Sequence, residues 1–181
     1  MKREDMLSFI IELNESEMIK FVRTFLSQNP ESIKKAYRLA KDIADQPDPE
    51  VISDEVFTEL DLYDFDDLNA QVAGADGYID EVDAIGELFE KAVEPLMDEM
   101  RKKIKLGLAG AAKAYCVGII EGLRQFVEEG TSELSDWFVD LPEEGARQAL
   151  KEWLASEPAE ADKAEVMKLF PEEWRDGDLF R

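Results

Sequence analysis

Apolar side chains recur at the three- and four-residue spacing of amphipathic helices over the first 44 residues. The spacing forms three consecutive series that are separated by polar or turn-forming residues. Ser16 is placed to cap the second series, and Asn29 followed by Pro30 resembles the N-cap and first-turn proline of the third. The pattern therefore predicts three amphipathic helices over residues 4–44.

A longer apolar series starts near Asp80 and continues to Met100, with Pro95 expected to kink the helix or to begin a second one. The most apolar segment of the chain follows, and it predicts a central core helix over residues 109–128 that ends at Gly130. Small residues recur along one side of this helix: Ala111, Ala114, Gly118 and Gly122. They would let a neighbouring helix approach closely, or alternatively leave a passage for a ligand.

The C-terminal part of the chain predicts a helix that begins at Pro142 and another around Val166. The similar sequences of residues 141–144 and 170–173 suggest a helical-hairpin repeat. No segment of strand length alternates apolar and polar residues. The expected fold class is therefore all-α, as a multi-helix bundle or a short helical-hairpin array of about 7–9 helices.

Charge is distributed unevenly along the chain, which has 43 Asp or Glu residues, 21 Lys or Arg residues and a net charge of -22. Seventeen acidic residues and no basic residue lie between Asp42 and Glu90, although apolar residues persist there and should keep this stretch folded. Turn-forming residues at 45–50 mark a change in composition. We expect one all-helical unit over residues 1–181, with a candidate sub-boundary at 45–50 between N-terminal helices (1–44) and the acidic and C-terminal helices (51–181).

The chain contains no histidine, which excludes several kinds of active site. Neither a Ser-His-Asp triad nor a Cys-His pair can form, and zinc cannot be bound through imidazole. The single cysteine, Cys116, cannot form an intramolecular disulfide, and its apolar surroundings in the sequence favour a buried, inert thiol. Any chemistry would have to use carboxylates, lysine, tyrosine or a bound ion.

The N-terminal sequence places acidic residues directly after its basic pair and lacks the apolar region of a secretory signal. The most apolar window, residues 106–120, contains Lys113 and is shorter than the about 20 residues of a membrane span. We therefore expect a cytoplasmic protein that does not enter a membrane. Because basic residues cluster only at 101–105, direct binding of nucleic acid is not expected.

One acidic turn has a recognisable spacing, at Ala73-Gly-Ala-Asp-Gly-Tyr-Ile-Asp-Glu-Val-Asp83. An ordinary EF-hand loop is not expected, because Val72 and Gly74 would occupy its first and third ligand positions and offer no side-chain oxygen. Residues 75–83 resemble the Ala-Asp-Gly-x-Ile-Asp-x-x-Glu motif between helices of TerB-like domains, an all-helical family associated with tellurite resistance and stress, with Asp83 in place of the glutamate. The resemblance implies a small helical domain with an acidic, cation-binding surface.

The positions that match this motif are candidate ligands for Ca²⁺ or Mg²⁺. They are Asp76, Asp80 and Asp83, with Asp64 and Asp67, or Asp61, as further carboxylates from the preceding helix. The alternative is purely structural. In that interpretation Gly77 ends one helix, Asp80 caps the next, and Asp83 completes a capping box and complements the helix dipole.

The function predicted from the sequence is that of a non-enzymatic, acidic helical interaction or scaffold protein whose partner is another protein, a basic one in particular. Aromatic residues near the C-terminus are the expected anchors for this partner: Trp137, Phe138, Trp153, Phe170 and Trp174.

Three other functions remain open, together with a halophilic source of the acidity. The first is a TerB-like, cation-binding stress protein, and the second is an inhibitor that imitates nucleic acid. The third is a Mg²⁺-dependent nucleotide hydrolase of the MazG type, with Glu87-x-x-Glu90 and Glu133-x-x-Asp136 as its carboxylate pairs.

Overall fold

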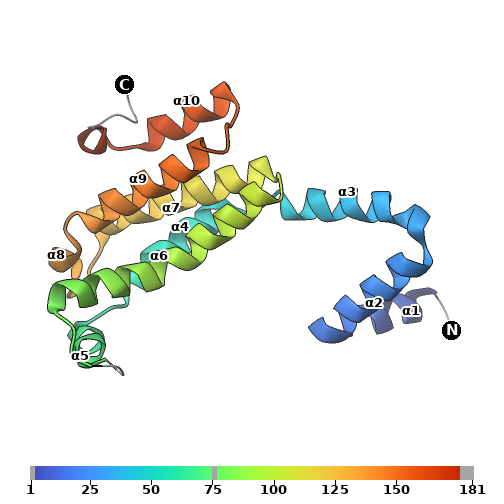
Figure 1. The fold of residues 1–181 in the computed structure, drawn as a ribbon, viewed down its shortest axis with the longest axis horizontal. Helices are drawn as coiled ribbons and strands as arrows, with labels where there is room; N and C mark the ends of the chain where they lie inside the picture. Colours follow the sequence, from blue (N-terminus) through green and yellow to red (C-terminus); the bar gives the residue numbers. More distant parts are fainter. Residues whose placement is uncertain (1–2, 75–76, 176–181) are drawn as a thin grey trace. The chain divides into compact units, whose positions relative to one another are not determined.

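The computed structural model describes residues 3–74 and 77–175 (Figure 1). These residues form ten α-helices and two 3₁₀ helices, and no strand occurs among them, which confirms the predicted all-α class. The helices are α1 (Arg3–Ile11), α2 (Glu15–Gln28), η1 (Pro30–Ser32), α3 (Ile33–Ala44), α4 (Pro49–Asp61), α5 (Phe65–Ala73), α6 (Glu81–Lys105), α7 (Ala109–Glu129), α8 (Ser135–Phe138), α9 (Leu141–Leu154), α10 (Glu160–Leu169) and η2 (Glu172–Trp174).

The chain divides into two compact units, Met1–Ile43 and Ala44–Arg181, called here the N-terminal and C-terminal units. In the N-terminal unit, α2 is capped by Asn14 rather than by Ser16, because Asn14 and Glu17 form a reciprocal capping box. Pro30 starts the short helix η1, and α3 follows it directly. No residue between positions 4 and 43 is buried.

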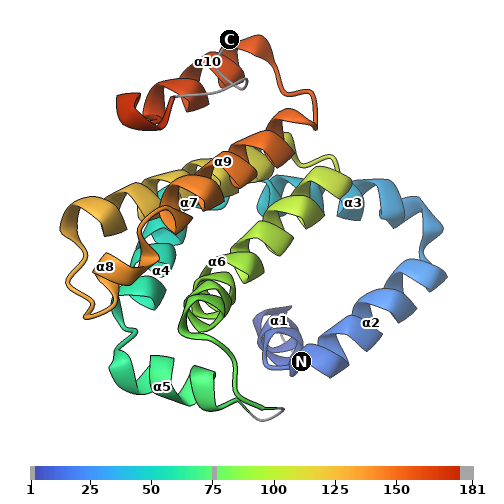
Figure 2. The ribbon, with the colours of Figure 1, turned by 60° about the vertical axis from the view of Figure 1, so that its left-hand side comes forward.

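Helix α7 is the centre of the C-terminal unit and packs against α4, α6, α9 and α10 (Figures 1 and 2). It spans Ala109–Glu129, so the predicted central helix over 109–128 is confirmed. Its apolar face meets those of its neighbours in one core, whose largest fully buried side chains include Phe138, Trp153 and Phe170. Burial of apolar area of this kind is the main force that holds the unit together.

The stripe of small residues on α7 is the surface on which α4 lies. A Cβ atom added at Gly118 would stand 2.6 Å from the Ile52 Cβ, and one added at Gly122 would stand 2.6 Å from the Ser53 carbonyl oxygen. Glycine at these positions therefore allows the two backbones to approach more closely than alanine would permit. Because α4 occupies this space, the alternative of a ligand passage along the glycines is wrong.

Helix α6 continues through Pro95 as one helix of 25 residues, so a second helix does not begin at this proline. Pro95 lies on the exposed face of α6. Proline has no backbone N–H, so the carbonyl group one turn earlier lacks its usual hydrogen-bond donor, and it can accept a hydrogen bond from water on this face. Exposure explains why the proline is tolerated.

Polar contacts between distant residues fix the helices of the C-terminal unit. The Asp45 carboxylate accepts a hydrogen bond of 2.8 Å from the Ala111 backbone N–H and so caps α7 from 66 residues away. Lys113 on α7 pairs with Asp162 and Glu165 on α10, at 2.8 and 2.6 Å. The start of α7 and its packing against α10 thus depend on tertiary contacts as well as on the sequence of α7 itself.

The aromatic residues near the C-terminus belong mostly to the core. Trp153 is only 1% exposed, and Phe138, Phe170 and Trp174 are also buried, so the prediction that these four anchor a partner is wrong. Trp137 is 42% exposed and meets Phe65 edge-on, with 6.3 Å between ring centroids. The suggested hairpin repeat is not seen in the part of the chain that the structure describes, where residues 170–173 run into the short helix η2.

No helix in the described part of the chain is long and apolar enough to cross a membrane.

Candidate functional site

The acidic turn before α6 has the geometry of a helix cap where the structure describes it. Asp80 is the N-cap of α6, and its carboxylate accepts a hydrogen bond of 2.8 Å from the Val82 backbone N–H. Asp83 lies in the first turn of α6, where a negative charge complements the helix dipole. Gly77 has a positive φ of 133°, which favours glycine, but the C-cap of α5 is Gly74, so the prediction that Gly77 ends this helix is wrong. Asp76, the remaining residue of the predicted site, lies outside the described residues.

The carboxylates expected to complete the cation site accept hydrogen bonds from backbone N–H groups. Asp64 is the N-cap of α5 and accepts hydrogen bonds from the Asp66 and Asp67 N–H groups, while Asp67 accepts one from the Asp64 N–H. Asp61 accepts hydrogen bonds from the N–H groups of residues 131 and 132. Over residues 3–74 and 77–175, no group of three or more acidic or cysteine side chains is close enough together to hold a metal ion.

The carboxylate pairs of the hydrolase alternative lie on separate elements. Glu87 and Glu90 are exposed on α6, and the Glu87 carboxylate accepts a hydrogen bond from Gln71. Asp136 lies in the short helix α8. In the described part of the chain they do not join into a metal-binding cluster.

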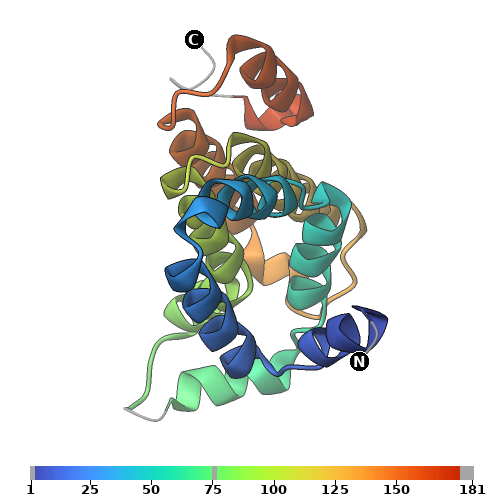
Figure 3. The ribbon, with the colours of Figure 1, turned by 90° about the vertical axis from the view of Figure 1, so that its right-hand side faces the viewer.

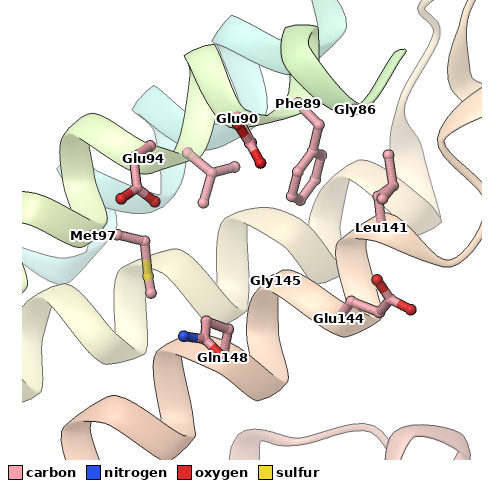
Figure 4. Close-up of a pocket in the computed structure, with 10 residues that line it drawn as sticks. Gly86, Phe89, Glu90, Glu94, Met97, Leu141, Glu144, Gly145 and Gln148 are labelled. Carbon is pink, nitrogen blue, oxygen red and sulfur yellow. The ribbon is translucent and has the colours of Figure 1, made fainter. Parts of the chain in front are cut away.

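A groove of about 320 Å³ lies between α6 and α9 (Figure 4). Its floor is apolar and consists of side chains from both helices: Phe89, Val93 and Met97 from α6, and Leu141 from α9. Phe89, Val93 and Met97 also belong to the buried core, which holds them in place. The floor is therefore a rigid apolar surface.

Two glycines shape this groove. A Cβ atom added at Gly145 would stand 2.8 Å from the Phe89 ring, so glycine at this position lets the ring lie against the α9 backbone. A Cβ atom added at Gly86 would meet no atom within 4 Å, because the groove is open there. The sequence-based predictions do not include this groove, although two glycines inside helical patterns are a signal of close packing or open space.

Carboxylates form the rim of the groove: Glu90 and Glu94 from α6, and Glu144 from α9. Glu94 is paired with Arg101. Among the residues that the structure describes, the side chains of Glu90 and Glu144 form no ion pair, and Glu90 is exposed. At Glu90 and Glu144 the rim therefore keeps negative charge with which no basic residue of the described ranges pairs.

Arg101 connects the two helices at the groove. Its guanidinium group binds the Glu152 carboxylate through two hydrogen bonds of 2.7 and 2.9 Å, and it also pairs with Glu94 and Asp98. Donation from Arg101 lowers the pKa of Glu152. The spacing of α6 and α9 is thus fixed by a two-bond ion pair as well as by apolar packing.

Comparison with known protein families, curated proteins and solved structures finds no match to this chain. The TerB-like resemblance of residues 75–83 therefore stays a prediction from the motif alone.

Proposed function

We propose that this protein is a non-enzymatic, acidic helical interaction protein that binds a basic, amphipathic helix of a partner protein in the groove between α6 and α9. The observation that carries this proposal is the combination of an apolar floor with unpaired carboxylates on the rim. An amphipathic helix with lysine or arginine beside its apolar stripe offers the complementary surface.

The size and charge of the groove favour a side chain over a nucleotide as its occupant. A volume of about 320 Å³ is at the lower end of the range of about 300–1,000 Å³ typical of ligand pockets. It suits one or two apolar side chains from a helix. The carboxylates of Glu90, Glu94 and Glu144 would repel phosphate groups.

The proposal is tested with a fluorescently labelled helical peptide of leucine and lysine, and with a scrambled peptide of the same composition as a control. Anisotropy titrations should show tighter binding of the amphipathic peptide. The double variant Glu90→Gln/Glu144→Gln should weaken binding about tenfold, because two partly desolvated charge pairs are lost. Gly86→Leu should abolish binding, since its side chain would project into the open end of the groove.

The matched control is the double variant Glu50→Gln/Asp54→Asn, which removes the same charge from exposed positions on α4, away from the groove. It should change the affinity less than twofold. If both double variants weaken binding equally, the attraction is diffuse and the groove is not the site.

A second candidate is the inhibitor that imitates nucleic acid. It is supported by the 14 exposed acidic residues among the 17 between Asp42 and Glu90, with no basic residue among them. Such a surface should displace a basic protein from DNA at low salt and fail to do so at high salt. Displacement that does not depend on ionic strength would rule this candidate out.

A further inference from the structure

Helices α1 to α3 present apolar side chains that the N-terminal unit does not bury within itself. Between positions 4 and 43, twelve large apolar residues are exposed: Met6, Leu7, Phe9, Ile11, Ile19, Phe21, Val22, Phe25, Ile33, Tyr37, Leu39 and Ile43. No residue in this range is buried, although the helices are amphipathic. Exposed apolar side chains in this number are typical of an interaction site.

The size of the N-terminal unit leads to the same conclusion. Helical segments of about 40 residues usually need a disulfide, a metal or association with another chain to remain folded. The only cysteine, Cys116, lies in the other unit and is free. Association remains as the source of stability. A standard interface uses about 20–30 residues on each side, which three short helices can supply.

Charge indicates what the partner is. Residues 1–43 contain eight Lys or Arg and seven Asp or Glu residues, whereas residues 44–181 contain 13 and 36 and carry a net charge of -23. Two copies of the C-terminal unit would repel each other, while two copies of the N-terminal unit would not. The N-terminal unit is therefore the part through which two copies of this chain can approach.

The charges of the N-terminal unit are also separated into two regions. Residues 4–17 contain five acidic residues and no basic one, and α3 contains Lys34, Lys35, Arg38 and Lys41 with a single acidic residue. Figures 2 and 3 show α1 and α3 at opposite ends of α2. The four basic residues of α3 form no ion pair in the described part of the chain.

We propose that the N-terminal unit is the interface of a homodimer, in which the apolar faces of α1 to α3 pack on those of a second copy. In a twofold arrangement each contact occurs twice, so the acidic residues 4–17 of each copy face the basic α3 of the other. An anionic membrane is the less suitable occupant, because the acidic residues 4–17 would oppose it. This dimer is independent of the groove between α6 and α9.

The test measures the mass of the full chain by sedimentation equilibrium at micromolar concentrations. The wild-type protein should have twice the monomer mass. The double variant Phe21→Gln/Phe25→Gln, which removes a stacked pair of exposed aromatic rings 6.0 Å apart, should be monomeric. The control Val51→Gln/Leu62→Gln removes apolar side chains of greater exposure from the C-terminal unit and should remain dimeric.

Charge reversal keeps the proposal testable if an apolar variant merely unfolds α1 to α3. Two charge-reversed variants should each be monomeric when alone: Lys34→Glu/Lys35→Glu/Arg38→Glu, and Glu12→Lys/Glu15→Lys/Glu17→Lys. An equimolar mixture of the two variants should form a heterodimer, because the opposite charges then face each other again. A monomeric wild-type protein would overturn the proposal. Dimers of the Phe21→Gln/Phe25→Gln variant would also overturn it, as would a mixture of the two charge-reversed variants that stays monomeric. A monomeric wild-type protein that binds vesicles of anionic phospholipid through α3 would favour the membrane instead.

Discussion

Gly118 lies so close to Ile52 that a methyl group on its α-carbon would come within 2.6 Å of the Ile52 β-carbon. Real Cβ atoms do not approach other atoms this closely, so α4 and α7 depend on the absence of a side chain at this position. The contact joins the first and the central helix of the C-terminal core.

The variant Gly118→Ala should lower the free energy of unfolding by about 1–3 kcal/mol, because overpacking outweighs the better helix propensity of alanine. Urea unfolding followed by circular dichroism measures this loss. Gly86→Ala is the matched control, since its new methyl group meets no atom within 4 Å, and it should raise the free energy of unfolding by about 0.5–1 kcal/mol. Equal effects of the two substitutions would mean that α4 and α7 do not approach as closely as described.

Glu152→Gln should lower the stability of the protein by about 1 kcal/mol at neutral pH, because it removes one partner of the two-bond pair with Arg101. The pKa of Glu152 is lowered in the folded state, so its contribution is complete above the unfolded value of about 4.3 and is lost as the pH falls through the folded value. The wild type and the variant should therefore become equally stable in acid.

This pH dependence is measured by urea unfolding of both proteins at a series of pH values. Glu128→Gln serves as the control, because it breaks the more exposed pair with Arg124 within α7 and should change stability little at any pH. A difference between Glu152→Gln and the wild type that persists unchanged at low pH would contradict the role of the ionised pair.

Asp80→Ala should destabilise the protein by about 1 kcal/mol through loss of the α6 cap. Glu81→Ala removes the next acidic side chain without removing that cap and should have a smaller effect. Melting curves in EDTA and in millimolar Ca²⁺ or Mg²⁺ should show the same loss for Asp80→Ala. A loss that appears only with the cation would instead establish the TerB-like, cation-binding function of the acidic turn.

Local sequence signals predicted the elements whose boundaries depend on nearby residues. The range of α7 and the N-cap at Asp80 followed from apolar spacing and capping chemistry, and both agree with the structure. The position of the α2 cap was wrong by two residues, because Asn14 and Ser16 can both cap a helix and the reciprocal bond from Glu17 selects Asn14.

Features that depend on distant residues were not predictable from local patterns. The groove exists because Gly145 on α9 meets Phe89 on α6, and no spacing within either helix reveals that contact. Likewise, Trp153 and Phe170 are aromatic residues of the kind that often anchor interfaces, yet the packing of α9 and of the segment after α10 buries them. The sequence shows that aromatic side chains are present near the C-terminus, but not whether each one faces the core or the solvent.

Because Cys116 is buried, the rate at which its thiol is labelled reports how often the core opens. Its side chain has no exposed surface, and burial raises the pKa of its thiol, so the reactive thiolate is scarce in the native state. A thiol reagent can reach the sulfur only when α7 separates from its neighbours. The labelling rate of the native protein therefore depends on how often the core opens. A ligand that holds α6 and α9 together would make such openings rarer and would slow labelling in proportion.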